Sequence, residues 1–238
     1  MAGRPEIRYG TPNFEMIRGW LSLPADQDGP FWAVNLMKYR AVADYGDGSV
    51  ATRSGRDADD EYSPLGSLAA IGAMVTFVAD VVTQTAGTPT WDRIGIVRYP
   101  SRAAFLAMQQ RDDFKSKHVH KEAGMEFTIV MSCRPTSTGD GASSGDGSFV
   151  MRVSRLTGAA PTRTEEPGVR PVARFDVEGV IVGDERQWSE VRFDWVDSDV
   201  LPALTDASQA DEQFVMTLRP TIDRLVTSIL PAPSPGSE

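Results

Sequence analysis

The chain has 238 residues, 41% hydrophobic and 24% charged, a composition typical of a soluble globular protein of one or two domains. With 24 lysines and arginines against 33 aspartates and glutamates, its net charge of −9 argues against nucleic acid and against an anionic membrane surface as partners. Cys133, the single cysteine, excludes an intrachain disulfide, and the lack of a long apolar run or signal-peptide core predicts a cytoplasmic protein.

Residues 1–29 are predicted to form an N-terminal arm. Its one apolar cluster runs from Phe14 to Leu21 and includes Met16, Ile17 and Trp20. These side chains recur at roughly helical spacing, which predicts a short helix that packs on the main body.

Residues 30–136 are predicted to form a first domain with the element order β-α-β-β-α-β. Strand-forming residues bounded by turn residues place its four strands at 31–39, 72–85, 91–99 and 126–134. Helices are expected around 64–71, after Ser101 as N-cap, and over 112–124, which ends at a glycine. The acidic loop 43–61 lacks the calcium-loop pattern and is predicted to be solvated.

The rest of the chain is predicted to repeat this order in reduced form. Residues 137–148 are small, polar and rich in glycine, as in a flexible linker, and 231–238 read as a disordered tail. Between them, a second domain over 149–230 is indicated because Trp188–Val196 aligns with Trp91–Tyr99. Its strands are expected at 149–156, 172–182, 188–196 and 213–219, with a helix over 197–208.

Alternation along the strands separates two faces of each predicted sheet. In the second domain, one face carries the charges of Glu190, Arg192 and Asp194, which either meet water as cross-strand ion pairs or line a polar cavity. The matching face of the first domain is mixed and has space at Gly95, which favours a cavity lining over a tight core.

The segment Trp91–Met108, followed by His118-Val-His-Lys-Glu-Ala-Gly124, resembles the dimeric α+β barrel superfamily, and most of all its small bacterial members of unassigned function. The match covers about residues 30–135, Lys121 stands where these proteins have arginine, and the second domain is a degenerate copy. The resemblance implies an α+β fold in which two ferredoxin-like β-α-β-β-α-β units, duplicated within the chain, form a dimeric α+β barrel, and it implies a homodimer. Relatives include cofactor-free monooxygenases, lactone isomerases, polyketide cyclases and haem enzymes, so no single reaction follows.

Two histidines, His118 and His120, are the only ones in the chain. On a helix their side chains point about 160° apart, so they cannot chelate one metal, and no metal site is predicted. His118 instead shares a face with Glu122. His120, which matches the family's histidine, is the predicted general acid or base, with helix capping as the structural alternative.

The remaining predicted site residues lie on the strands of the first domain. Tyr99 and Asn35 are predicted to be catalytic, as donors to a developing oxyanion, although Asn35 can equally make a structural hydrogen bond. Residues predicted to contact substrate are Tyr39, Met37, Arg93, Arg98, Trp91 and His118; for Trp91, packing in the core is the alternative.

These residues predict a cofactor-independent enzyme that acts by acid–base chemistry on a small, largely apolar oxygenated molecule, such as an aromatic, polyketide-like or lactone compound. The reaction would be an isomerisation, cyclisation, dehydration or monooxygenation. A haem-dependent enzyme and a non-catalytic ligand-binding or assembly module remain as alternatives. Neither a glycine-rich phosphate loop nor a Gly-x-Ser-x-Gly elbow occurs in the sequence.

Overall fold

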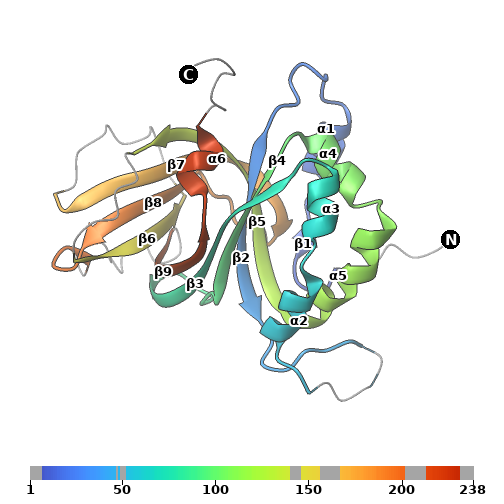
Figure 1. Cartoon of the computed structure of the whole chain (residues 1–238), viewed down its shortest axis with the longest axis horizontal. Helices are drawn as coiled ribbons and strands as arrows, with labels where there is room; N and C mark the ends of the chain where they lie inside the picture. The colour runs from blue at the N-terminus through green and yellow to red at the C-terminus, as the bar shows by residue number, and fades with distance from the viewer. Residues whose placement is uncertain are drawn as a thin grey trace, which may run out of the picture.

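A computed structural model describes residues 7–46, 48, 52–139, 146–155, 167–201 and 213–230. In this part of the chain, eight antiparallel strands close into one barrel (Figure 1). Around the barrel the strands are β7 (Val169–Gly183), β5 (Met125–Thr138), β2 (Phe31–Tyr39), β4 (Arg93–Tyr99), β3 (Met74–Ala86), β9 (Gln213–Asp223), β6 (Gly147–Ser154) and β8 (Glu190–Asp197). Pairing of β8 with the first half of β7 closes the ring, and the short β1 (Thr11–Pro12) pairs with the end of β7 on the edge opposite β5.

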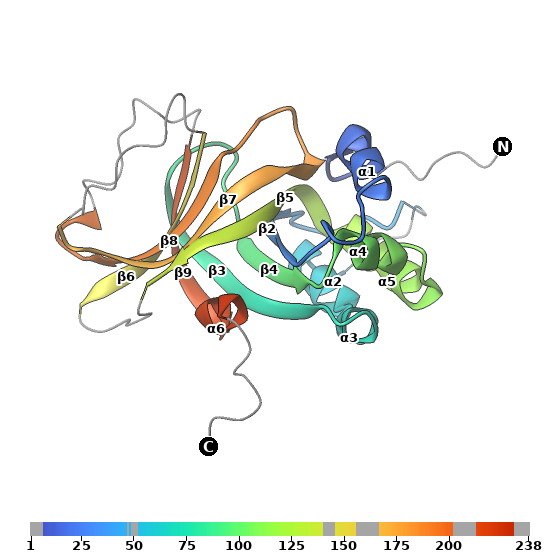
Figure 2. The same cartoon turned by 90° about the horizontal axis from the view of Figure 1, so that it is seen from above.

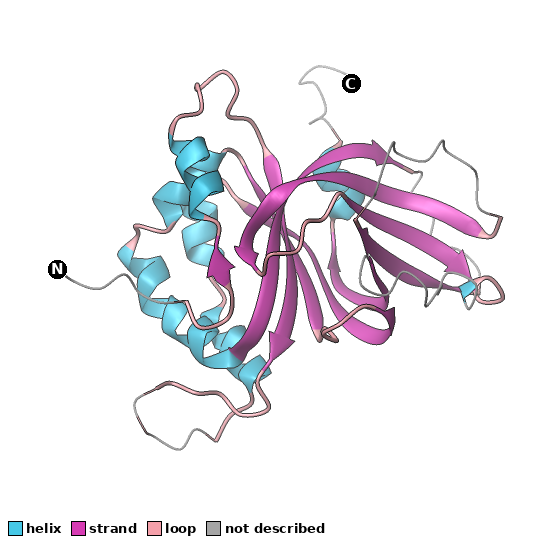
Figure 3. Cartoon of the chain, turned by 180° about the vertical axis from the view of Figure 1, so that it is seen from behind, coloured by secondary structure: helices cyan, strands magenta, loops and turns pink. Residues whose placement is uncertain are grey.

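Helices gather on one side of the barrel, outside the strands of the first half of the chain (Figure 3). They are α1 (Phe14–Leu21), α2 (Gly55–Tyr62), α3 (Leu65–Ala70), α4 (Arg102–Met108) and α5 (Asp112–Gly124). The sixth helix, α6 (Leu225–Ile229), packs against β3, β5 and β7 at one end of the barrel (Figure 2). Its Leu225 is fully buried in the barrel core, and its Ser228 Oγ accepts a 3.0 Å hydrogen bond from the indole of Trp32. No helix among the described residues is long and apolar enough to span a membrane.

This architecture corrects the predicted fold class and the predicted family resemblance. The described residues are predominantly β, with 45% in strands and 25% in helices, and they form a closed eight-stranded β-barrel rather than the two ferredoxin-like units of a dimeric α+β barrel. The reason lies in β3 and β5, which extend past their own half and pair with β9 and β7 of the other half. An isolated half would leave these strands as open edges, whereas closing the barrel satisfies their backbone groups.

Many local elements are confirmed. The strand over 31–39 and the helix over 112–124 have the predicted bounds, and Ser101 caps α4 by accepting a hydrogen bond from the Ala104 amide. The predicted N-terminal helix is α1. The prediction of a solvated loop over 43–61 was wrong for its last part, because Ser54 and Asp57 form a capping box that starts α2.

Several predictions fall partly or wholly outside the described residues: the tail over 231–238, most of the helix over 197–208, and residues 140–145 of the linker. At either side of those six residues, β5 continues to Thr138 and β6 begins at Gly147. The proposed domain limits therefore stay predictions.

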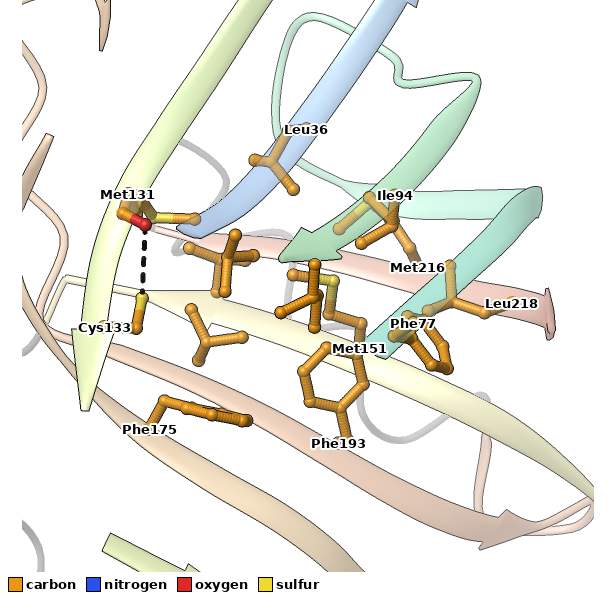
Figure 4. Close-up of a cluster of buried hydrophobic side chains, with 14 of the residues drawn as sticks. Leu36, Phe77, Ile94, Met131, Cys133, Met151, Phe175, Phe193, Met216 and Leu218 are labelled. Atoms are coloured by element: carbon orange, nitrogen blue, oxygen red, sulfur yellow. Dashed lines mark hydrogen bonds between the residues drawn. The ribbon is translucent and has the colours of Figure 1, made fainter. Parts of the chain in front are cut away.

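Side chains fill the interior of the barrel (Figure 4). Alternate residues of each strand point inward, and the innermost are fully buried: Leu36, Phe77, Ile94, Met131, Met151, Phe175, Phe193 and Met216. Cys133 is buried among them, with Sγ donating a weak 3.8 Å hydrogen bond to the carbonyl of Met131, so it packs as the small apolar residue expected. The interior of this barrel is therefore its core.

The charged strand faces of the second half lie on the outside of the barrel. Arg174 pairs with Glu190, and Asp194 accepts a 2.9 Å bond from Arg152 and lies 3.3 Å from Arg192. The cross-strand ion pairs expected for this face are present, but Glu190 and Asp194 are buried, so these two carboxylates do not meet water as expected.

Two glycines set the position of α2. A Cβ on Gly55 would lie 2.3 Å from the carbonyl oxygen of Gly124, so only glycine allows α2 and the end of α5 to approach this closely. This close approach of α2 to α5 places Asp59, Asp60 and Tyr62 of α2 at the edge of a cavity between the helices and the barrel.

Candidate functional site

A cavity of about 460 Å³ lies between the outer surface of the barrel and the helices. Its floor comes from the residues of β2 and β4 that point away from the barrel core, among them Ala33, Asn35 and Gly95. The volume falls within the range of roughly 300–1,000 Å³ that is usual for small-molecule sites.

Most of the cavity wall is apolar. Helices and strands supply Leu68, Val97, Phe105, Met108, Phe114, Val130 and Ile181. Tyr99 also lines the cavity; its ring stacks on Phe31 at 5.3 Å and its hydroxyl has no hydrogen bond to the described residues. Burial raises the pKa of the Tyr99 hydroxyl, so it stays protonated and can act as a donor.

Polar groups collect at one place on the wall, around His118 of α5. The hydroxyl of Tyr9 lies 3.1 Å from Nε2 of His118, and Glu122 Oε1 lies 3.7 Å from the same nitrogen. Nδ1 of His118 is buried and has no hydrogen-bond partner in the described part of the chain. Burial, and secondarily the charge of Lys121, lower the pKa of His118 to about 4, so this imidazole is neutral at physiological pH.

Lys121 follows one helical turn later and is half-buried. Its Nζ lies 5.7 Å from the ring centre of Tyr9 and 5.4 Å from that of Tyr62. Within the described residues this ammonium group makes neither a hydrogen bond nor an ion pair. Its apolar surroundings lower the pKa of Lys121, against the opposite effect of Asp59 and Glu122.

A set of ionic contacts marks the edge of the cavity. Asp59 accepts a 2.7 Å hydrogen bond from the hydroxyl of Tyr39, while Arg93 binds Asp60 at 2.7 Å and lies 3.7 Å from Asp59. The Arg93 guanidinium also lies over the ring of Tyr39, 5.6 Å from its centre. Burial, and secondarily Asp59, raise the pKa of Tyr39.

The structure brings together five of the residues predicted to form the site, since Asn35, Met37, Arg93, Tyr99 and His118 all line the cavity. Tyr39 lies beside them, joined to the cavity wall through Asp59. The amide of Asn35 donates to the carbonyls of Ala33 and Gly95, which is the structural bond expected, while its Oδ1 accepts no hydrogen bond from the described residues.

The other three predicted site residues lie elsewhere. His120 projects from the opposite side of α5, where Nδ1 is 3.0 Å from the hydroxyl of Tyr45. Trp91 packs in the barrel core, and Arg98 lies over the ring of Trp32, 5.5 Å from its centre. The two-residue spacing of the histidines puts them on opposite helix faces, so only one of them can reach the cavity.

Sequence reasoning missed Tyr9, Tyr62, Asp59 and Lys121 as members of the site. Helix spacing could have predicted that Lys121 belongs to the site, because a residue three positions after His118 shares its helix face. Tyr9 and Tyr62 carried none, since they lie on other segments and reach the cavity only through tertiary packing.

No group of three or more His, Cys, Asp or Glu side chains in the described ranges is placed to hold a metal ion.

The sequence matches no protein-family model and no curated protein. Two solved structures are similar to part of the chain. The methylated RPA0582 protein is 24% identical, with 57% of this chain and 100% of that chain covered and a TM-score of 0.49. RPA0582 of Rhodopseudomonas palustris, a protein of unknown function, is 23% identical, with 54% and 98% covered and a TM-score of 0.47. At this level of similarity, neither structure supports an argument about function.

Proposed function

We propose that this protein is a cofactor-independent enzyme that binds a small, largely apolar oxygenated molecule in the cavity and rearranges it by proton transfer. The observation that carries the proposal is the combination of an apolar wall with a polar cluster formed by Tyr9, His118 and Lys121. Such a site holds the body of a ligand by burial and places its oxygen function at the cluster.

The Tyr9–His118 pair supplies the acid–base chemistry. Because His118 is neutral at physiological pH, it can accept a proton from a carbon next to a carbonyl group. Its Nδ1 is buried, so exchange with a ligand passes through Nε2 or through the Tyr9 hydroxyl beside it. Glu122, 3.7 Å from Nε2, stabilises the imidazolium that forms, and the pair can return the proton to a different atom of the ligand.

This assignment moves the acid–base role from His120 to His118. His118 lines the cavity, whereas His120 bonds Tyr45 on the other side of the helix. The hydroxyl of Tyr99 then remains to donate to the oxygen function of the ligand, and the amide oxygen of Asn35 remains to accept from a hydroxyl group on it.

The test is proton exchange in D2O, followed by NMR, with a panel of phenols, lactones and aromatic ketones as ligands. A lactone or ketone that binds should exchange hydrogen for deuterium next to its carbonyl group. His118→Gln should lower that rate by about 100-fold or more while keeping affinity, which is the usual contribution of general acid–base catalysis. His120→Gln is the matched control and should exchange at the wild-type rate.

Failure of the whole panel to bind would contradict the proposal, as would wild-type exchange in His118→Gln. Binding without exchange or turnover of any ligand would favour the non-catalytic ligand-binding module instead.

A further inference from the structure

The carboxylates near the polar cluster already have partners. Asp59 and Glu122 are the two acidic groups whose charges act on Lys121. Asp59 accepts a hydrogen bond from Tyr39 and lies 3.7 Å from Arg93, which also binds Asp60. Each charge on this side of the cavity is therefore matched by another side chain.

The same holds on the other side of Lys121. Glu122 lies 3.6 Å from Nε of Arg8, and Arg8 also donates a 2.8 Å hydrogen bond to Asp44. Neither Glu122 nor Asp59 comes within ion-pair distance of Lys121 in the described structure.

Lys121 is thus a half-buried cation in the cavity wall with no ion-pair partner among the described residues. The faces of Tyr9 and Tyr62 interact favourably with the charge but accept no conventional hydrogen bond. An ammonium group carries three donors, and desolvating it without an acceptor costs free energy. A hydrogen-bond acceptor on a ligand would bind these donors and offset the cost of desolvating the ammonium group.

Resting on the proposed function of this cavity, we infer that its ligand is a monoanion, an apolar body with one carboxylate, and that Lys121 binds the carboxylate. One unmatched cation fits one negative charge, and Asp59 and Glu122 would repel a second. The apolar body lies against Leu68, Val97 and Phe114, and the Tyr9–His118 pair lies beside the carboxylate.

The test compares 2-naphthoate with 2-naphthamide, which has nearly the same shape and no charge, by calorimetric titration at pH 7. The wild-type protein should bind the acid about 10- to 100-fold more tightly than the amide, the factor expected for a charge-assisted hydrogen bond. Lys121→Met should remove this preference. Lys115→Met, which removes an exposed lysine from the same helix, should preserve it.

Equal affinity of the wild-type protein for acid and amide would refute the inference, whether or not Lys121→Met folds. The same holds if Lys121→Met keeps the preference for the acid. Reductive trapping of an aldehyde ligand on Lys121 by borohydride would overturn it in favour of imine formation. In each of these cases the proposed function survives, because a ligand still occupies the cavity. If neither these two compounds nor any member of the phenol, lactone and ketone panel binds, the proposed function is refuted as well.

Discussion

Acidification is expected to destabilise the folded protein through His118. Its pKa is about 4 in the folded state, compared with 6.5 for an unperturbed imidazole. Below pH 6.5 the unfolded chain therefore gains a proton at this residue, whereas the folded chain gains it only near pH 4. Stability is unaffected above pH 7 and falls as the pH drops through this window, by about 2 kcal/mol at pH 5 and about 3 kcal/mol at pH 4.

The groups that face the imidazole explain why it resists protonation. Phe114 and Tyr62 pack against its ring and exclude water, and Lys121 adds a positive charge; Glu122 lies 3.7 Å from Nε2. The shift is thus a property of tertiary packing that the unfolded chain does not have.

Urea unfolding at pH 7, 6, 5 and 4 measures this effect in the wild-type protein and in His118→Gln. Other groups titrate in both proteins, so the difference between their free energies of unfolding isolates His118. Relative to the variant, the wild type should lose about 2 kcal/mol between pH 7 and pH 5. Parallel pH dependences, or an NMR titration of His118 with a midpoint near 6.5, would refute the reasoning.

Two further substitutions test the site and the second half of the barrel. Gly95→Phe should fold but lower ligand affinity at least about tenfold in a ligand titration followed by NMR, because its side chain fills the cavity. Gly95→Ala, whose Cβ meets only the flexible end of Met37 at 3.2 Å, should bind normally in that titration. Unchanged binding by Gly95→Phe would place the ligand elsewhere. Asp194→Ala should cost about 3 kcal/mol in urea unfolding, because it removes a buried carboxylate that binds both Arg152 and Arg192. Asp176→Ala on the exposed surface should change stability by less than about 0.5 kcal/mol. Equal losses in the two aspartate variants would mean that the buried pair contributes nothing.

Period-two alternation was enough to identify much of the cavity floor. In β2 and β4 it separated Asn35, Met37 and Gly95 from the residues that point into the barrel, because neighbouring side chains of a strand must face opposite ways. Spacing on a helix likewise showed that the two histidines could not act together. These are local properties of strand and helix geometry, so they hold whatever position the segment takes in the tertiary structure.

The sequence by itself determined where most strands and helices lie, which residues of a strand share a face, and that a mixed face of the first half lines a cavity. Tertiary structure alone decided that the strands close into one barrel, because that depends on β3 and β5 pairing with β9 and β7 of the other half. It also decided that the cavity lies between the barrel and its helices, and that His118 rather than His120 faces it. The surroundings of Lys121 also depend on tertiary structure, since its flanking rings come from Tyr9 and Tyr62, which no local pattern brings together.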